Sequence, residues 1–192
     1  MKKAIIGYGG HAREVLSQMG KKLPCFVDDN YVSEETLPLS SLDVKKYKVM
    51  VAIANPIDRL NVVKNLPKGT KFFSFVHPTA LILDKNIKIG KGSFIGAFSV
   101  LTTNIKIGDY AILNRSNHIG HDTIVGDYFS SMPGSIISGN CTIGDSVYLG
   151  TNSSVREKIT ICDNVTVGLN SGVVKNINKS GTYVGLPSKK IK

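Results

Sequence analysis

The sequence predicts a small α/β domain followed by a parallel β-helix built from six-residue repeats. From residue 83 to residue 178, an aliphatic residue recurs every six positions, glycine often follows it, and a second, often small residue stands four places after it. Only Ser131 breaks the aliphatic register. A fixed short period of this kind is typical of a parallel β-helix, because each repeat buries its apolar residue only by stacking on the next coil. The register residues are Leu83, Ile89, Ile95, Leu101, Ile107, Leu113, Ile119, Val125, Ile137, Ile143, Leu149, Val155, Ile161, Val167 and Val173.

Six residues form one short strand and a corner, so three repeats predict a three-sided coil of about 18 residues. Coils that stack roughly 4.8 Å apart predict a column of about five coils. Large register residues fill the axis, and glycine supplies corner conformations that a Cβ would oppose. A sandwich with chance spacing is the alternative, which so long an unbroken run disfavours. The spacing does not fix the handedness.

The first 76 residues follow a different pattern, in which short apolar runs alternate with helical periodicity. Strands alternating with helices predict a parallel sheet covered by helices. We therefore expect a nucleotide-binding βαβαβ domain over residues 1–76 and a β-helix with a short tail over residues 77–192. The expected strands are Lys3–Gly7, Leu23–Val27, Tyr47–Ile53 and Lys71–Val76, and the expected helices are Arg13–Met19 and Ile57–Leu66.

Composition bears on whether the protein spans a membrane, binds nucleic acid or holds a metal. The 192 residues carry a formal net charge of +10 and contain no apolar run near 18 residues, so no transmembrane span is expected. The lysines are scattered, and phosphorylated small molecules explain the charge at least as well as nucleic acid does. Cys25, Cys141 and Cys162 lack metal-ligand spacing, which predicts no metal site and favours a reducing cytoplasm.

A glycine-rich turn after the first strand is the first candidate binding site. A tight turn between a strand and a helix aims backbone N–H groups and the positive helix end at a phosphate. Two carboxylates about 20 residues further on can accept hydrogen bonds from a ribose or a base. The alternatives are a tight turn and a strand end without ligands. The candidate residues are Gly7, Gly9, Gly10, His11, Asp28 and Asp29.

Several segments together resemble one family. The opening IIGYGGHAREV, the FVDD strand end, the FVHPTA junction, the unbroken repeats and the closing VGLPSKKIK are similar to bacterial sugar acetyltransferases of the PglD/NeuD type. The resemblance implies a left-handed β-helix, acetyl-CoA as co-substrate, a homotrimer and a role in glycan biosynthesis. It also implies N-acetylation of a 4-amino nucleotide-linked sugar or, as the alternative, O-acetylation of sialic acid. A non-catalytic trimeric scaffold or ligand sensor is the alternative from another class.

The segment LNRSNHIGHDTIVGD contains the candidate base. By resemblance, the general-base histidine and the acidic residue after it correspond to His121 and Asp122, and His118 is the competing base. An imidazole can take a proton from an attacking amine near neutral pH. One coil after His121 stands Gly139, whose N–H by resemblance stabilises the thioester oxyanion. No serine or cysteine stands in a nucleophile motif, so we expect direct transfer in a ternary complex.

The donor side of the expected site is less well defined by the sequence. By resemblance, Asn114 corresponds to a position beside the acetyl donor, and Ser130 stands where related enzymes often carry a second histidine. The coenzyme A arm is expected along a groove near the carboxyl-terminal coils. Gly168, Lys175 and Lys189 are the candidates for contacts with it.

Overall fold

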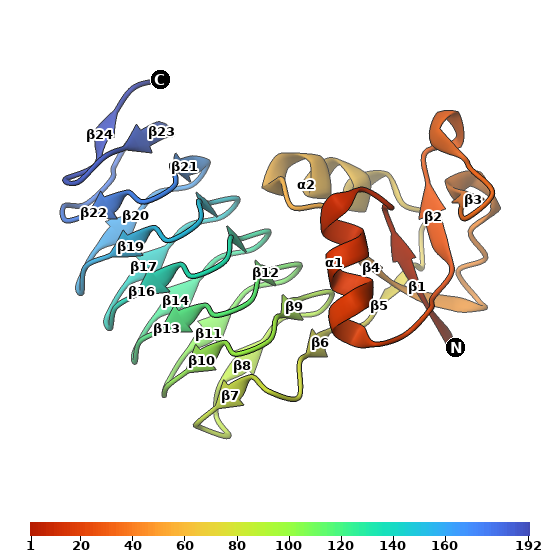
Figure 1. The fold of residues 1–192 in the computed structure, drawn as a ribbon, viewed down its shortest axis with the longest axis horizontal. Helices are drawn as coiled ribbons and strands as arrows, with labels where there is room; N and C mark the ends of the chain where they lie inside the picture. The colour runs from red at the N-terminus through yellow and green to blue at the C-terminus, as the bar shows by residue number, and fades with distance from the viewer.

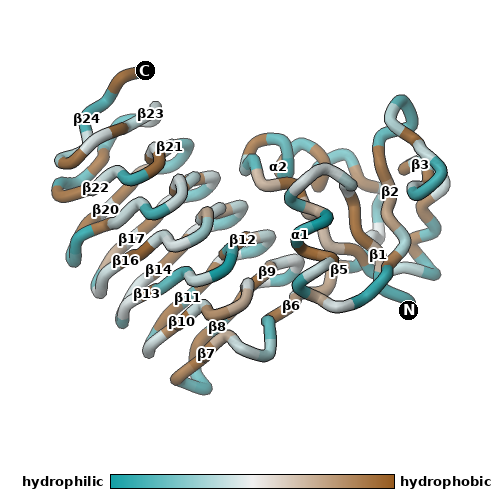
Figure 2. The backbone as a smooth tube through the Cα atoms, viewed as in Figure 1, coloured by the Kyte–Doolittle hydropathy of each residue, from teal (hydrophilic) through white to brown (hydrophobic).

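The computed structural model describes residues 1–192 and contains two parts that lie side by side (Figure 1). The amino-terminal part is a parallel sheet with helices, and the rest of the chain winds into a stacked prism. Figure 2 shows hydrophobic residues in brown along β1 and β2, two of the inner strands of the amino-terminal part. The prediction of an α/β domain followed by a left-handed parallel β-helix is confirmed.

The amino-terminal sheet is a doubly wound, five-stranded parallel sheet in the order β3-β2-β1-β4-β5. Ile5 packs with the α1 side and Ile6 with the α2 side, because successive strand residues point to opposite faces. The two helices therefore cover opposite faces of the sheet. The elements are β1 (Lys2–Ile6), α1 (Gly10–Met19), β2 (Cys25–Val27), η1 (Asp29–Tyr31), β3 (Leu37–Pro38), η2 (Leu39–Ser41), β4 (Tyr47–Val51), α2 (Pro56–Asn65) and β5 (Lys71–Phe72).

Two features of this domain differ from the elements expected from the sequence. The short strand β3 and the two 3-10 turns were not expected, since two-residue strands carry no alternation that a pattern can detect. The expected strand Lys71–Val76 divides into two strands. Its first half, β5, pairs with β4, whereas Phe75–Val76 forms β6 and pairs with β9 of the prism. The boundary at residue 76 stays a prediction.

The prism has three faces, and each strand pairs in parallel with the strand one coil away. The domain face lies against the amino-terminal part and contains β6 (Phe75–Val76), β9 (Phe94–Ile95), β12 (Ile112–Leu113), β15 (Ser130–Ser131), β18 (Tyr148–Leu149), β21 (Val165–Val167), β23 (Gly181–Val184) and β24 (Lys189–Lys190). The second face contains β7 (Leu81–Ile82), β10 (Val100–Leu101), β13 (His118–Ile119), β16 (Ile136–Ile137), β19 (Ser154–Val155) and β22 (Gly172–Val173). The third face contains β8 (Lys88–Ile89), β11 (Lys106–Ile107), β14 (Ile124–Val125), β17 (Thr142–Ile143) and β20 (Thr160–Ile161).

The pairing register follows the coil length expected from the repeats. Leu101 pairs with Ile119, which pairs with Ile137, and these partners are 18 residues apart. The register residues from Ile95 onwards are buried in one continuous axial core. Ser131, the one break in the register, is buried there too, and the large ring of Phe129 fills the neighbouring slot that is usually small. The exchange of large and small side chains keeps the core volume of that coil.

One buried arginine joins the two parts of the molecule. Arg59 of α2 is fully buried and donates hydrogen bonds to carbonyl oxygens of Ile53 and Ala54 in its own domain. It also donates to the carbonyls of Tyr110 and Tyr128, on two successive coils of the prism. Burial lowers the pKa of this guanidinium to about 9, so it is charged at neutral pH.

At the other end of the prism, β23 and β24 form an antiparallel hairpin over the last coil. The hairpin covers a sheet edge that would otherwise present unpaired backbone groups. No helix of the structure is long and apolar enough to span a bilayer.

Candidate active site

The corner between the second and third faces carries a vertical row of residues with left-handed backbone conformation. Asn104, Asp122, Asn140 and Lys158 stand one above another, with φ of 50°, 57°, 58° and 61°. Asparagine and aspartate tolerate this region better than most residues, which explains why the row can form without glycine. We call this row the corner column. It contains the predicted acid of the site.

His121 and Asp122 form a hydrogen-bonded pair at this corner. His121 Nδ1 lies 2.7 Å from Asp122 Oδ2, and the two side chains are 55% and 43% exposed. Adjacent side chains in a regular strand point apart, and the left-handed turn at Asp122 brings these two together. Hydrogen bonds from Asn104 and then from His121 lower the pKa of the Asp122 carboxyl. The carboxylate is therefore ionised and fixes which ring nitrogen of His121 faces outward.

Gly139 lies directly above the imidazole, as the coil length predicts. A Cβ at this position would come within 2.5 Å of His121 Nε2, so only glycine leaves room for the ring in this place. The Gly139 N–H donates no hydrogen bond within the chain. At the corner between the third and domain faces, by contrast, the N–H of Asp109 donates to the Asp127 carboxylate of the next coil. The structure thus places against Nε2 of His121 a glycine whose backbone N–H has no partner within the chain.

The competing base, His118, has different surroundings. It lies on β13 in the flat second face, where its register neighbours are Val100 and Ile136. It is exposed and makes no ion pair with a carboxylate. The geometry therefore favours His121 over His118 as the residue prepared for proton transfer.

The amino-terminal domain holds a second group of expected residues in a cavity of about 420 Å³. Gly7, Gly9 and Asp28 line it together with Tyr31 and Thr36. The cavity lies at the carboxyl ends of β1 and β2, beside the point where the strand order reverses. Open α/β sheets bind ligands at such a switch point. Gly7 has φ of +106°, which favours glycine at this turn.

Three other expected residues of this turn do not line the cavity. Gly10 is the first residue of α1. The His11 ring is mostly buried and lies 3.8 Å from Glu14, and burial lowers the pKa of its imidazole. Asp29 accepts a hydrogen bond from the Ser40 N–H at 3.1 Å and so ties η1 to η2. The geometry indicates no ligand contact for the side chains of His11 and Asp29.

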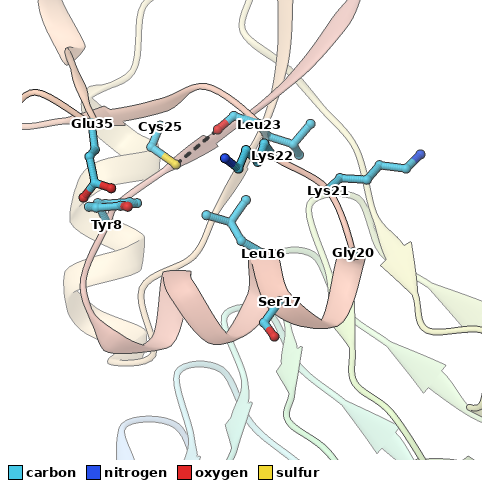
Figure 3. A pocket seen from close by; sticks show the side chains of 9 residues that line it. All are labelled: Tyr8, Leu16, Ser17, Gly20, Lys21, Lys22, Leu23, Cys25 and Glu35. Atoms are coloured by element: carbon cyan, nitrogen blue, oxygen red, sulfur yellow. Dashed lines mark hydrogen bonds between the residues drawn. The ribbon is translucent and has the colours of Figure 1, made fainter.

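A separate cleft of about 490 Å³ lies on the other side of Tyr8 (Figure 3). Figure 3 shows Tyr8 with its hydroxyl beside the Glu35 carboxylate, while Lys21 and Lys22 lie on the loop after α1. The hydrogen bond with Glu35 raises the pKa of Tyr8. None of the expected site residues lines this cleft.

Asn114 and Ser130 lie at the junction between the two parts. Asn114 is buried and donates to Glu14 of α1 at 3.4 Å. Ser130 is buried too, accepts a hydrogen bond from Arg59 at 2.8 Å and donates one to the Ala54 carbonyl at 2.7 Å. Because this hydroxyl is buried and its proton is already donated inside the chain, it is not accessible to an acetyl donor in this conformation.

The expected cofactor residues near the carboxyl terminus are partly brought together. Lys175 and Lys189 line one cleft of about 320 Å³ beside Tyr183. Gly168 lies under the terminal hairpin, where an added Cβ would come within 2.8 Å of Val184. It therefore serves close packing of the hairpin in this structure.

Within one chain, the corner that carries His121 and the amino-terminal cavity are on different sides of the prism. His121 stands at the edge shared by the second and third faces, and in a triangular prism this edge is opposite the remaining face. That remaining face carries the amino-terminal domain. No group of three or more histidine, cysteine, aspartate or glutamate side chains is arranged to hold a metal ion.

Two residues of this region were not expected from the sequence. Asn104 donates to Asp122, and it stands one coil before Asp122, so the same register arithmetic that identified Gly139 could have found it. Arg59 was missed because its partners are main-chain carbonyls of distant segments. No sequence motif marks such a contact.

Comparison with known proteins supports the predicted family. Residues 2–66 match the family model described as the PglD N-terminal domain. The acetyltransferase domain of PglB from Neisseria gonorrhoeae, solved with acetyl coenzyme A, is 28% identical with a TM-score of 0.86, and the match covers 99% of this chain and 98% of that chain. WeeI from Acinetobacter baumannii is 28% identical with a TM-score of 0.88, and the match covers both chains completely.

A perosamine N-acetyltransferase from Caulobacter crescentus, solved with CoA and GDP-perosamine, has the same fold at 24% identity and a TM-score of 0.88, over 100% of this chain and 97% of that chain. A search of curated protein sequences finds no match. The expected resemblance to PglD/NeuD-type proteins is confirmed: residues 2–66 match the PglD N-terminal domain, and the whole chain has the architecture of the PglB acetyltransferase domain and of WeeI.

Proposed function

We propose that this protein transfers the acetyl group of acetyl-CoA to the 4-amino group of a nucleotide-linked amino-deoxy sugar. The observation that carries the proposal is the corner at His121. There an imidazole is oriented by a carboxylate, and its outward nitrogen lies against Gly139, whose backbone N–H is unpaired. This arrangement matches what acyl transfer to an amine requires, namely a base for the amine proton and a donor for the developing oxyanion.

The proposed reaction is a direct transfer. His121 Nε2 takes a proton from the sugar amine while the amine nitrogen attacks the thioester carbonyl carbon. The Gly139 N–H donates to the carbonyl oxygen as its negative charge develops. When the tetrahedral intermediate collapses, the carbon–sulfur bond breaks, the coenzyme A thiolate leaves, and the proton held on His121 can pass to that sulfur. Asp122 stabilises the imidazolium in between.

The amino-terminal cavity is the proposed site for the nucleotide. The N-terminus of α1 follows Gly9 and has no side-chain cap and no acidic residue in its first turn. Its free N–H groups and helix dipole therefore favour a diphosphate. Asp28 and Tyr31 line the same cavity and supply a carboxylate and an aromatic ring for a ribose or a base.

We propose a homotrimer in which neighbouring subunits complete each site. A nucleotide sugar held in the amino-terminal cavity of one chain faces away from that chain's own His121, so a second copy must supply the imidazole. The second face provides a surface for such contacts: Leu81 and Ile136 point outward and are 54% and 44% exposed. Lys175 and Lys189 are exposed in one cleft and are the proposed contacts for the coenzyme A phosphates. We also propose a cytoplasmic location for this activity, which the unpaired cysteines and the proposed use of acetyl-CoA support.

The test is an assay of thiol release from acetyl-CoA with a panel of 4-amino nucleotide sugars and, separately, sialic acids. We expect turnover with at least one nucleotide-linked amino sugar. His121→Ala should lower kcat by about 1,000-fold, because a general base is lost, with acetyl-CoA affinity and melting temperature near those of the wild type.

His118→Ala is the matched control, since this second histidine lies three residues away on the flat face, and it should retain most of the activity. Acetylation of sialic acids alone would replace the proposed acceptor. A protein that neither binds acetyl-CoA nor releases thiol with any acceptor would contradict the enzymatic proposal and favour a scaffold.

A further inference from the structure

Asp122 has a second partner that comes from the coil below it. Asn104 Nδ2 donates a hydrogen bond of 2.6 Å to Asp122 Oδ1, while Asp122 Oδ2 contacts His121. The two oxygens of one carboxylate are therefore engaged by two different side chains. A carboxylate held at both oxygens cannot rotate about its terminal bond without breaking one of the contacts.

Asn104 is itself fixed from the coil below. Its backbone N–H donates to Asp84 Oδ2 at 3.2 Å, and the hydroxyl of the preceding residue, Thr103, donates to the same oxygen at 2.6 Å. The corner is thus braced through three successive coils, from Asp84 through Asn104 to Asp122. Each link is a hydrogen bond of 3.2 Å or less.

The left-handed corner by itself does not produce this contact. Asn140 stands in the same corner column with φ of 58°, and its side chain forms no hydrogen bond. Asn170 occupies a left-handed corner elsewhere with φ of 52°, is exposed, and likewise has no side-chain partner. Backbone preference explains why asparagine is found at these corners, but it does not explain the link from Asn104 to the acid of the catalytic pair.

We propose that Asn104 is a positioning residue for the acetyl transfer, acting through Asp122 on the orientation of the His121 ring. Its amide donor keeps the Asp122 carboxylate turned toward His121 Nδ1, and this leaves Nε2 directed at the acceptor amine. Asn104 does not touch the reacting atoms. The inference rests on the proposed function and adds a residue that the histidine–acid pair alone does not require.

The charges around the carboxylate support this role. Asp84 lies below Asn104, His121 lies beside Asp122, and Lys158 ends the corner column above. The Asn104 amide makes the largest contribution to lowering the pKa of Asp122, followed by His121. An amide at position 104 therefore stabilises the ionised form of Asp122, whereas a carboxylate at that position would destabilise it.

The first experiment removes the amide without disturbing the backbone. Asn104→Gly keeps the left-handed conformation, so its effect reports the lost side chain. We expect kcat to fall roughly tenfold while KM for both substrates stays within about twofold, because orientation of the base matters for proton transfer rather than for binding. Asn170→Gly makes the same change at a corner without a side-chain contact and should leave kcat unchanged.

The second experiment replaces the donor by an acceptor of the same shape. Asn104→Asp places two carboxylates at hydrogen-bond distance, which raises the pKa of one of them. When that group is protonated, it can donate to Asp122 as the amide does. The ratio of variant to wild-type kcat should therefore rise as the pH is lowered from 8.5 to about 6, whereas the ratio for Asn104→Gly should stay flat.

The outcomes separate this inference from the proposed function. If the wild type turns over and Asn104→Gly equals Asn170→Gly in kcat, Asn104 has no positioning role. If Asn104→Gly and Asn104→Asp show the same ratio to wild type at all pH values, the residue acts only through packing, and the inference is wrong. A wild type without acetyl transfer contradicts the proposed function itself.

Discussion

At the scale of single residues, the candidate base is held by three coils at once. Asp122 contacts its Nδ1, Asn104 fixes Asp122 from below, and the backbone of Gly139 lies above its Nε2. Gly139 thus has a steric role that is independent of its N–H group. The backbone φ at Gly139 is not in the left-handed region, so the close approach of the ring is the reason for glycine here.

Replacement of Gly139 tests this steric role. Gly139→Ala would place a methyl group against the imidazole, and we expect kcat/KM to fall about 100-fold because the base is displaced. The measurement is a double-mutant cycle on the melting temperature: the alanine should destabilise the wild type but cost little in a His121→Ala background. Equal destabilisation in both backgrounds would show that the ring is not what excludes a side chain.

At the scale of secondary-structure elements, α2 is the connection that orients the two domains. The guanidinium of Arg59 donates only to main-chain carbonyls and to Ser130, so it has no carboxylate partner. A buried cation in this setting is stabilised by several oriented carbonyl dipoles together. Glu14 of α1 adds a partly exposed ion pair to Arg115 at 3.2 Å, and such pairs contribute little to stability.

Replacement of Arg59 should therefore lower the stability of the folded protein. Arg59→Met leaves buried carbonyls on both domains without a donor, and we expect the free energy of unfolding to fall by about 3 kcal/mol or more. Calorimetry should also resolve two transitions in place of one, because the domains lose their common contact. Arg59→Lys is the matched variant that keeps the charge but not the planar set of donors. Its free energy of unfolding should lie between those of the wild type and Arg59→Met. A single unshifted transition for Arg59→Met would show that other contacts fix the domains.

At the scale of the whole molecule, the separation of the amino-terminal cavity from His121 predicts that the proposed activity depends on assembly of several subunits. Each proposed site combines the cavity of one subunit with the corner of another. Oligomers with closed symmetry repeat this combination around the axis. A variant that stays monomeric is expected to bind its substrates but not to catalyse the acetyl transfer.

This expectation can be tested by mixing two inactive variants and measuring the recovered acetyltransferase activity. His121→Ala destroys the corner, and Asp28→Lys is designed to destroy the cavity, so each homotrimer should be inactive. Trimers assembled from equal amounts of both should recover roughly a quarter of the wild-type sites, since each site needs one intact contribution from each neighbour. No recovery in mixed trimers of proven composition would place the cavity and the imidazole of one site in the same chain.

The sequence predicted the architecture because the repeat encodes burial directly. The axial register, the coil length and the proximity of Gly139 to His121 all follow from counting residues. The split of Lys71–Val76 between two sheets and the strand Leu37–Pro38 could not be predicted, since such short pairings depend on partners that are distant in the chain. The burial of Ser130 was missed for the same reason, because its partners Arg59 and Ala54 are distant in the chain. The roles of the site residues stay predictions.

The prism also has a constant repeat, because every complete coil has the same length and the same lateral pairing. The N–H groups of Asp109, Asp127 and Asp145 each donate to the aspartate one coil further along. Consecutive coils therefore offer equivalent hydrogen-bonding groups to the next coil. Removing or duplicating a complete turn beyond the one that carries Gly139 would restore every lateral pairing. The chain can thus be lengthened or shortened at its far end, while the corner at His121 keeps its place relative to the domain anchored by Arg59.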